Sequence, residues 1–338
     1  MNGTKGAEMT RKRILAGMRP SGKLHVGHYH GALKSWLRLQ EEHDCFFFSA
    51  DWHALTTEFA DPSRVNDDTL EMALDWLAAG LDPEKSTVFV QSLVPEHAEL
   101  FLVFGMVTPV SWLERNPTYK EQREQIHDKD LGNFGFLGYP CLQAADILIY
   151  KGAGVPVGIA QVPHVELTRE IARRFNHLYG PVFPEPEAVL SESPKVPGTD
   201  GRKMSKSYGN AILLSDPPEV IAKKLRPMVT DPARKRRTDP GNPDICPVYD
   251  LHRIYSSAET LEWSAQGCRT AGIGCLEWKQ PLIDAVIASL APFQERRSRL
   301  AGDPGYIREI LRQGSARARD VAAATWDEVR KAIRMERI

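Results

Sequence analysis

The sequence has no apolar run long enough to cross a membrane, and its first residues, 1–13, lack the hydrophobic core of a secretory signal. Its 338 residues include only five cysteines, an odd number that argues against a disulfide framework and fits a reducing compartment. These absences argue against a membrane-spanning or secreted protein. We therefore expect a cytoplasmic protein.

The sequence also lacks an excess of charge of either sign. It has 43 basic and 44 acidic residues, for a formal net charge of −1. A nucleic-acid partner would therefore have to bind local patches of Lys and Arg rather than a basic surface. With 42% hydrophobic and 26% charged residues, the chain is long enough to form two domains with a sizeable core.

In the first part of the chain, apolar runs of strand length alternate with segments that have the apolar spacing of a helix. Arg13 to Gly17, Cys45 to Ala50 and Thr87 to Gln91 are such runs, and Val65 to Ala79 is a helical segment between two of them. This alternation predicts an α/β fold with a doubly wound parallel sheet. Prolines and glycines recur from Gly180 to Gly201, which predicts a loop without regular structure.

The first motif, Arg19 to His28 (RPSGKLHVGH), lies between a predicted strand and the start of a helix. Unpaired N–H groups at a helix start can hold a phosphate. His25 and His28 are three residues apart and can face the same ligand, and Gly27 leaves room for a flat ring. Taken alone, the motif is equally consistent with a metal-binding pair or with two ordinary helix histidines.

The second motif, Lys203 to Ser207 (KMSKS), follows the long loop, as a lid would. Alone it is typical of a solvated basic loop. Together the two motifs resemble the signatures of class I aminoacyl-tRNA synthetases. The segments Ser49 to Thr57, Asn116 to Glu121 and Glu166 to Arg169 make the chain similar to the bacterial tryptophanyl family.

The resemblance implies a Rossmann-like catalytic domain over residues 1–215, with a dimerisation insertion near 96–138, and a helical anticodon-binding domain over 216–338. It implies that the protein binds L-tryptophan, ATP with Mg²⁺, and tRNA(Trp). It also implies that the protein is a homodimer. The residues it assigns to catalysis on the phosphates are His25, His28, Lys203, Lys206 and Lys120. Those it assigns to ATP binding are Arg19, Ser21, Gly22, Gly27, Met204, Ser205 and Ser207.

Residues 139–150 read as a helix with Pro140 at its first position, and this helix contains an aspartate that is costly to bury without a donor. The resemblance gives Asp146 the role of accepting the indole N–H of tryptophan. Such an acceptor would reject phenylalanine, which leaves it unpaired. The residues expected to line the same pocket are Tyr139, Gln143, His53 and Gln161. Ile159 and Ala160 stand where an acidic residue is more common in the family, so from that loop we expect only Gln161 to bind.

Two features of the second domain remain ambiguous. The basic run Arg234 to Arg237 could contact phosphate or simply be solvated. Cys246, Cys268 and Cys275 resemble an iron–sulfur spacing of some relatives, but Trp278 stands where the fourth cysteine would fall, so a four-thiolate cluster is impossible and no metal is expected. Two other functions stay open: a tyrosyl-tRNA synthetase, and an adenylate-binding relative that does not charge tRNA.

Overall fold

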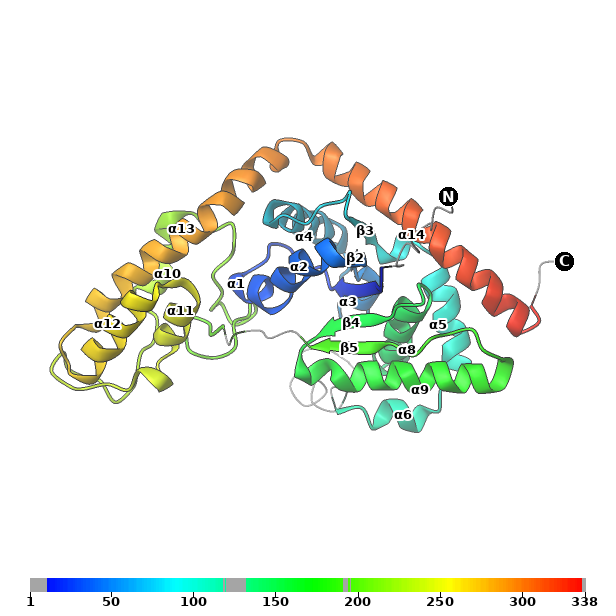
Figure 1. Cartoon of the computed structure of the whole chain (residues 1–338), viewed down its shortest axis with the longest axis horizontal. Coiled ribbons are helices and arrows are strands. Elements are labelled where there is room, and N and C mark those ends of the chain that lie inside the picture. Colours follow the sequence, from blue (N-terminus) through cyan, green and yellow to red (C-terminus); the bar gives the residue numbers. More distant parts are fainter. Residues whose placement is uncertain (1–10, 118, 120–131, 191–193, 195, 336–338) are drawn as a thin grey trace, which may run out of the picture.

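The fold was described from a computed structural model, which covers residues 11–335 apart from 118, 120–131, 191–193 and 195. Five parallel strands form one sheet in the order β3-β2-β1-β4-β5 (Figure 1). The strands are β1 (Arg13–Met18), β2 (Asp44–Ser49), β3 (Ser86–Val90), β4 (Gly154–Val157) and β5 (Glu187–Leu190). The predicted Rossmann-like sheet is confirmed.

Helices cover both faces of the sheet, which is why its central strands are mostly apolar after their first residue. The helices of this part are α1 (Val26–His28), α2 (Lys34–Glu42), α3 (Asp51–Glu58), α4 (Val65–Ala79), α5 (Glu96–Val107), α6 (Val110–Glu114), α8 (Phe134–Leu148) and α9 (Val162–Tyr179). A π-helical turn, Tyr29–Leu33, joins α1 to α2.

Side chains of the central strands alternate between two cores. Ile14 and Phe47 point to one side, where Trp36 stacks on Phe47 with ring centroids 4.6 Å apart. Leu15 and Phe46 point to the other side, toward α5 and α8. This period of two, read along neighbouring parallel strands, explains how so apolar a sheet fills both of its faces.

Two expectations about regular structure are wrong. Residues 187–190 form the edge strand β5, although a loop was expected there. Prolines before it are tolerated because an edge strand pairs on one side only. Helix α8 begins at Phe134, capped by the Asn133 side chain, so Pro140 lies inside the helix rather than at its first position. The missing N–H of Pro140 costs one helical bond, which burial of the surrounding turn offsets.

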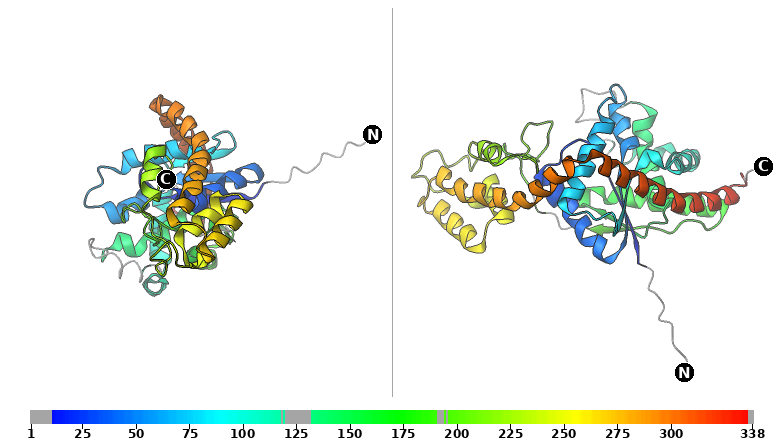
Figure 2. Two further views of the ribbon diagram at one scale, coloured as in Figure 1. Left: turned by 90° about the vertical axis from the view of Figure 1, so that its left-hand side faces the viewer. Right: turned by 90° about the horizontal axis from the view of Figure 1, so that it is seen from above.

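The rest of the chain is helical, as expected. Its helices are α10 (Pro218–Leu225), α11 (Pro247–Tyr255), α12 (Ala258–Arg269), α13 (Cys275–Ala301) and α14 (Pro304–Ala332). Helix α13 leads from α10 and α11 back to α4, and α14 then runs along the sheet (Figures 1 and 2). The domain boundary near residue 215 stays a prediction.

Helix α14 packs directly on the edge strand β3. At Gly314 any side chain would collide with the carbonyl oxygen of Val88, so the two backbones touch. The Ser315 hydroxyl accepts the N–H of Val90 at 3.2 Å. The last helix therefore closes an edge that would otherwise present unpaired backbone groups.

Two of the three cysteines of the helical part lie in its core, and Cys275 is half-buried. Cys246 and Cys268 are buried, and Trp278 is buried against His252, with ring centroids 5.5 Å apart. Among the described residues, no three His, Cys, Asp or Glu side chains are grouped so as to hold a metal ion. In the same part of the chain no helix is both long and apolar enough to span a bilayer.

Arg234 also faces inward. It is 8% exposed and donates to the carbonyl oxygens of Arg237 and Ile273. It is therefore not available to a phosphate, and of the basic run only Lys235, Arg236 and Arg237 reach the surface.

Candidate active site

A cavity of about 290 Å³ opens beyond the carboxyl ends of β1 and β2, where parallel sheets of this kind bind ligands. It is lined by β1, α3, α8 and the turn after β4. The structure brings together in its wall six residues predicted from the sequence, namely Arg19, His53, Tyr139, Gln143, Asp146 and Gln161.

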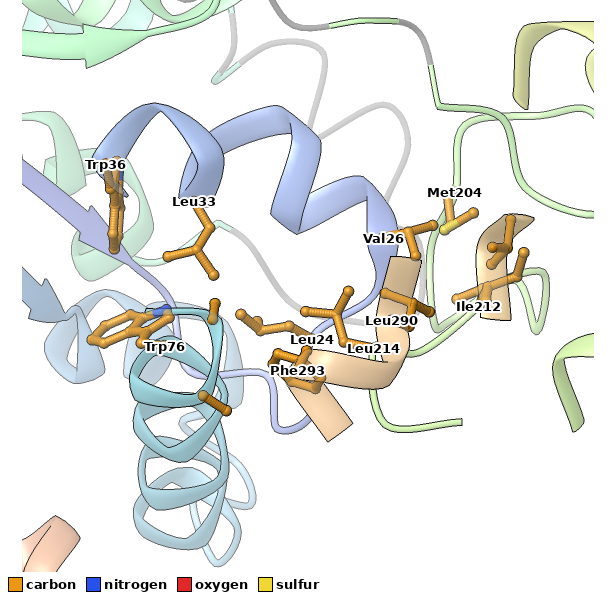
Figure 3. Packing of buried hydrophobic residues seen from close by; sticks show 14 of the residues in the cluster. Leu24, Val26, Leu33, Trp36, Trp76, Met204, Ile212, Leu214, Leu290 and Phe293 are labelled. Carbon is orange, nitrogen blue, oxygen red and sulfur yellow. The ribbon is translucent and has the colours of Figure 1, made fainter. Parts of the chain in front are cut away.

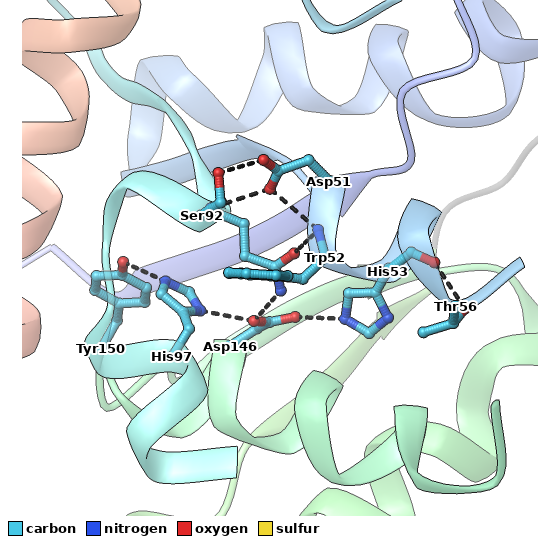
Figure 4. A network of polar contacts seen from close by, with 9 residues as sticks. Asp51, Trp52, His53, Thr56, Ser92, His97, Asp146 and Tyr150 are labelled. Carbon is cyan, nitrogen blue, oxygen red and sulfur yellow. Dashed lines mark hydrogen bonds and ion pairs between the residues drawn. The ribbon is translucent and has the colours of Figure 1, made fainter. Parts of the chain in front are cut away.

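Asp146 is the most constrained of these residues. It is 2% exposed, and its Oδ2 accepts from Nε2 of His53 at 2.8 Å (Figure 4). Its Oδ1 accepts from Nδ1 of His97 and from Nε2 of Gln91, both at 2.6 Å. A buried carboxylate needs such donors, and here they fix its orientation toward the cavity.

The charge of Asp146 follows from these contacts. Burial alone would raise the pKa of its carboxyl, but the nearby charge of His53 and the hydrogen bonds from His53 and His97 outweigh burial and lower the pKa to about 2. The cavity therefore holds a fixed anionic acceptor at neutral pH.

Gln91 and His97 were not predicted. Gln91 directly follows β3, at the same sheet edge as the cavity, and that position was a usable signal. His97 lies in the first turn of the apolar helix α5, where it also contacts the Tyr150 hydroxyl through Nε2 at 2.7 Å. Only the packing of α5 on α8 reveals that contact.

A second set of contacts holds the start of α3, which carries His53. Asp51 accepts from the backbone and hydroxyl of Ser92, and the N–H of Trp52 donates to Oε1 of Gln91 at 3.1 Å (Figure 4). Gln91 thus connects the frame of α3 to Asp146. The position of His53 is set from two sides.

The first motif forms the second part of the site. His25 caps α1, and its ring stacks on that of His28 with centroids 3.7 Å apart. At Gly27 a Cβ atom would lie 2.9 Å from the His25 ring and 3.6 Å from Met204, so a side chain there would have to displace the His25 ring. Arg19 reaches back to the Thr57 hydroxyl and connects the motif to the cavity.

Both histidines are uncharged near neutrality. Burial, helped by the positive charges of Lys206 and Lys203, lowers the pKa of His25 to about 4. Burial and the neighbouring His25, together with the same lysines, lower the pKa of His28 to about 3. Neutral rings can donate one hydrogen bond each to an anion without carrying charge.

The second motif lies against the first. Lys206 donates to the carbonyl oxygens of Ser21 and Lys23, the latter at 2.9 Å. Lys203 is exposed, the hydroxyls of Ser205 and Ser207 lie 2.8 Å apart, and the Met204 side chain is buried in the core. Gly22, at φ +71°, makes the turn that lets the Ser21 carbonyl face Lys206. Lys120 lies outside the described residues.

The family of the chain follows from comparison with known proteins. Residues 8–291 match the family described as tRNA synthetases class I (W and Y). The chain is 55% identical to a tryptophan–tRNA ligase of Thermotoga maritima, over 96% of this chain and 99% of that protein. It is 47% identical to one of Ralstonia nicotianae, again over 96% of this chain and 99% of that protein.

Solved structures show the same relationship. A tryptophanyl-tRNA synthetase of Campylobacter jejuni, complexed with ADP and tryptophan, superposes with a TM-score of 0.85 at 33% identity, covering 95% of this chain and 99% of that chain. Identity of this level over nearly the whole length decides between the tryptophan and tyrosine branches. The chain therefore belongs to the class I tRNA synthetases, in the branch of the tryptophan–tRNA ligases.

Proposed function

We propose that the chain activates L-tryptophan with ATP and transfers it to tRNA(Trp). The tryptophan carboxylate attacks the α-phosphorus of ATP, the bond to the β-phosphate breaks, and pyrophosphate leaves. A hydroxyl of the terminal ribose of tRNA then attacks the activated carbonyl, and AMP leaves. The observation that carries this proposal is the ionised, buried Asp146 at the wall of a cavity joined to a phosphate-binding motif.

Tryptophan would occupy the cavity beside α8. Its indole N–H would donate to Oδ2 of Asp146, which accepts from His53 and has room for a second donor. Tyr139, Gln143 and Gln161 would line the same cavity. Phenylalanine would leave the carboxylate without this donor, and a site built in this way rejects such an analogue by about 10⁴-fold or more.

ATP would lie between the two motifs, with Arg19, Ser21, Gly22, Gly27 and the Met204–Ser207 segment around it. His25, His28, Lys203, Lys206 and Lys120 would stabilise charge on the phosphates. Mg²⁺ would be held mainly by the triphosphate and water, which needs no acidic cage in the protein. Lys206 now donates to carbonyl oxygens of the first motif, so it would exchange these partners for phosphate oxygens.

Residues 216–338 would supply the anticodon-binding surface, in the cytoplasm where tRNA is charged. The chain would act as a homodimer, which is supported by an apolar groove of about 380 Å³ between α3, α5 and α8. Helix α5, which lines this groove, also carries exposed apolar side chains, with Leu102 at 60% and Met106 at 75%. Leu102→Asp should give monomers in sedimentation, whereas Leu276→Asp, at a site on α13 that is 72% exposed, should not.

The decisive experiment is ATP–pyrophosphate exchange with tryptophan, tyrosine, phenylalanine and no amino acid, followed by charging of tRNA. Exchange with tryptophan alone, together with charging, is the expected result. Exchange without charging would instead identify the adenylate-binding relative. Equal exchange with phenylalanine would remove Asp146 as the selector.

A further inference from the structure

Helix α13 contacts α4, which lies beside the first motif, and the stretch that follows the second motif. Its last turns lie against α4, and two of its side chains, Gln294 and Arg297, stand three residues apart and therefore on one face. Each of them is hydrogen-bonded toward a different motif. The helix is thus placed to fix the position of the two motifs relative to each other.

Arg297 reaches the first motif through a buried carboxylate. Its Nε donates to Oδ1 of Asp75 at 2.6 Å, and its Nη2 donates to Glu71. Asp75 is fully buried on α4, and its Oδ2 accepts the backbone N–H of Leu24 at 2.6 Å. A carboxylate in this position needs both partners, because a buried charge that loses one of them is left uncompensated.

Leu24 directly precedes His25 and is itself fully buried (Figure 3). Its carbonyl oxygen accepts the N–H of Leu214 at 2.9 Å, and the N–H of Val26 donates to Ile212 at 3.0 Å. The residues beside His25 are therefore paired with the stretch that follows the second motif. The Asp75 carboxylate fixes the remaining side of this short extended segment.

Gln294 holds the partner stretch from the other side. Its Nε2 donates to the carbonyl oxygens of Leu214 at 3.2 Å and Asp216 at 2.8 Å. Leu290 and Phe293, on the same helix, pack in the core beside Leu24 and Leu214 (Figure 3). A shift of α13 would therefore move polar contacts to both motifs at once.

We propose that Arg297 and Asp75 are positioning residues for the activation step. Through the N–H of Leu24 they fix the position of His25, and with it the first motif, relative to α13. The proposal rests on the function proposed above. Because α13 also packs on α10 and α11, the pair Arg297 and Asp75 connects the helical part of the chain to the first motif.

The test compares Arg297→Gln, Asp75→Asn and the double variant with Arg296→Gln. Arg296 is the matched control, because it lies on the same helix and donates to the Ala78 carbonyl oxygen at 2.6 Å but not to the motif. Two quantities are measured: kcat and KM for ATP and tryptophan in pyrophosphate exchange, and the hydrogen-exchange rate of the Leu24 amide.

We expect Arg297→Gln to lower kcat/KM for ATP on the order of 10- to 100-fold, as misplacement of a reacting group by about 1 Å does, with the KM for tryptophan nearly unchanged. The Leu24 amide should exchange faster, and Arg296→Gln should alter neither quantity. The double variant should recover most of the loss, because two amides can keep the hydrogen bonds without a buried unpaired charge.

A different pattern would overturn the proposal. If Arg297→Gln melts at a lower temperature but keeps kcat/KM for ATP and the Leu24 exchange rate, the pair is structural only. Should Arg297→Gln not fold, the isosteric Asp75→Asn is measured in its place. If the unmodified enzyme shows no pyrophosphate exchange, the proposed function fails. The hydrogen-exchange rates of the Leu24 amide still decide whether α13 holds the first motif in place.

Discussion

Nδ1 of His97 lies 2.6 Å from Oδ1 of Asp146, with both side chains out of contact with solvent. Since Asp146 is ionised, it can only accept, so Nδ1 carries the proton. Nε2 of the same ring shares a hydrogen bond with the Tyr150 hydroxyl, 2.7 Å away. A chain of hydrogen bonds from Tyr150 through His97 thus ends on the carboxylate that faces the cavity.

Tyr150→Phe removes the hydroxyl group that is hydrogen-bonded to Nε2 of His97 and leaves this nitrogen buried without a partner. We expect the free energy of unfolding to fall by about 1 to 3 kcal/mol. The KM for tryptophan should rise with it, because His97 is then less firmly held. Urea unfolding and exchange kinetics measure both effects. Tyr179→Phe, at an exposed position on α9, is the control and should change neither.

Asp146→Asn keeps the shape of the side chain but removes its charge. Its donors His53, His97 and Gln91 then face a partly donating amide. We expect kcat/KM for tryptophan to fall on the order of 10²-fold, the value of one hydrogen bond to a charged group, with a smaller fall for phenylalanine. Measured selectivity that stays the same would contradict the assignment of Asp146.

Lys206→Ala should slow adenylate formation on the order of 10²- to 10³-fold, as the loss of one aimed donor does. Tryptophan binding should change far less, because Lys206 does not line the cavity around Asp146. Single-turnover adenylate formation and equilibrium dialysis with tryptophan separate the two effects. Equal losses in both would count against a role on the phosphates.

The stability of the protein should depend on the protonation of His25. Burial holds its pKa near 4 in the folded protein, against 6.5 for a free side chain, so on acidification the unfolded chain takes up the proton first. His25 therefore lowers the unfolding free energy progressively below about pH 6.5, by about 3 kcal/mol at pH 4, and costs nothing above that range.

His25→Asn should reduce the loss of stability between neutral pH and pH 4.5 in urea unfolding. His177→Asn removes an exposed histidine of α9 and serves as the control. The same pH dependence in both variants would show that His25 is not protected from protonation in the folded protein.

The features predicted from the sequence are those that depend on residues close together along the chain. Period and strand length predicted the sheet, whereas the family resemblance, and not a local pattern, pointed to the cavity residues around Asp146. Contacts between distant segments could not be predicted, as with His97, whose partners Asp146 and Tyr150 come from α8 and the turn that follows it. The pair Asp75 and Arg297 was missed for the same reason, because nothing in either helix shows that the two side chains meet.

Two local errors have local causes. Pro140 suited a first helical position, but the Asn133 cap about two turns earlier was the stronger signal for the helix start. Glu187–Leu190 were too short and too closely flanked by prolines to indicate a strand. Only the open side of β4 makes a strand of them.

The contact between Gly314 and Val88 has a consequence for how the protein is made. Strand β3 (Ser86–Val90) is synthesised long before α14 (Pro304–Ala332), the helix that covers it. Until α14 has been made, the nascent sheet presents an uncovered edge on which other strands can pair. The sheet, although most of it is made early, is therefore protected at this edge only after α14 has left the ribosome.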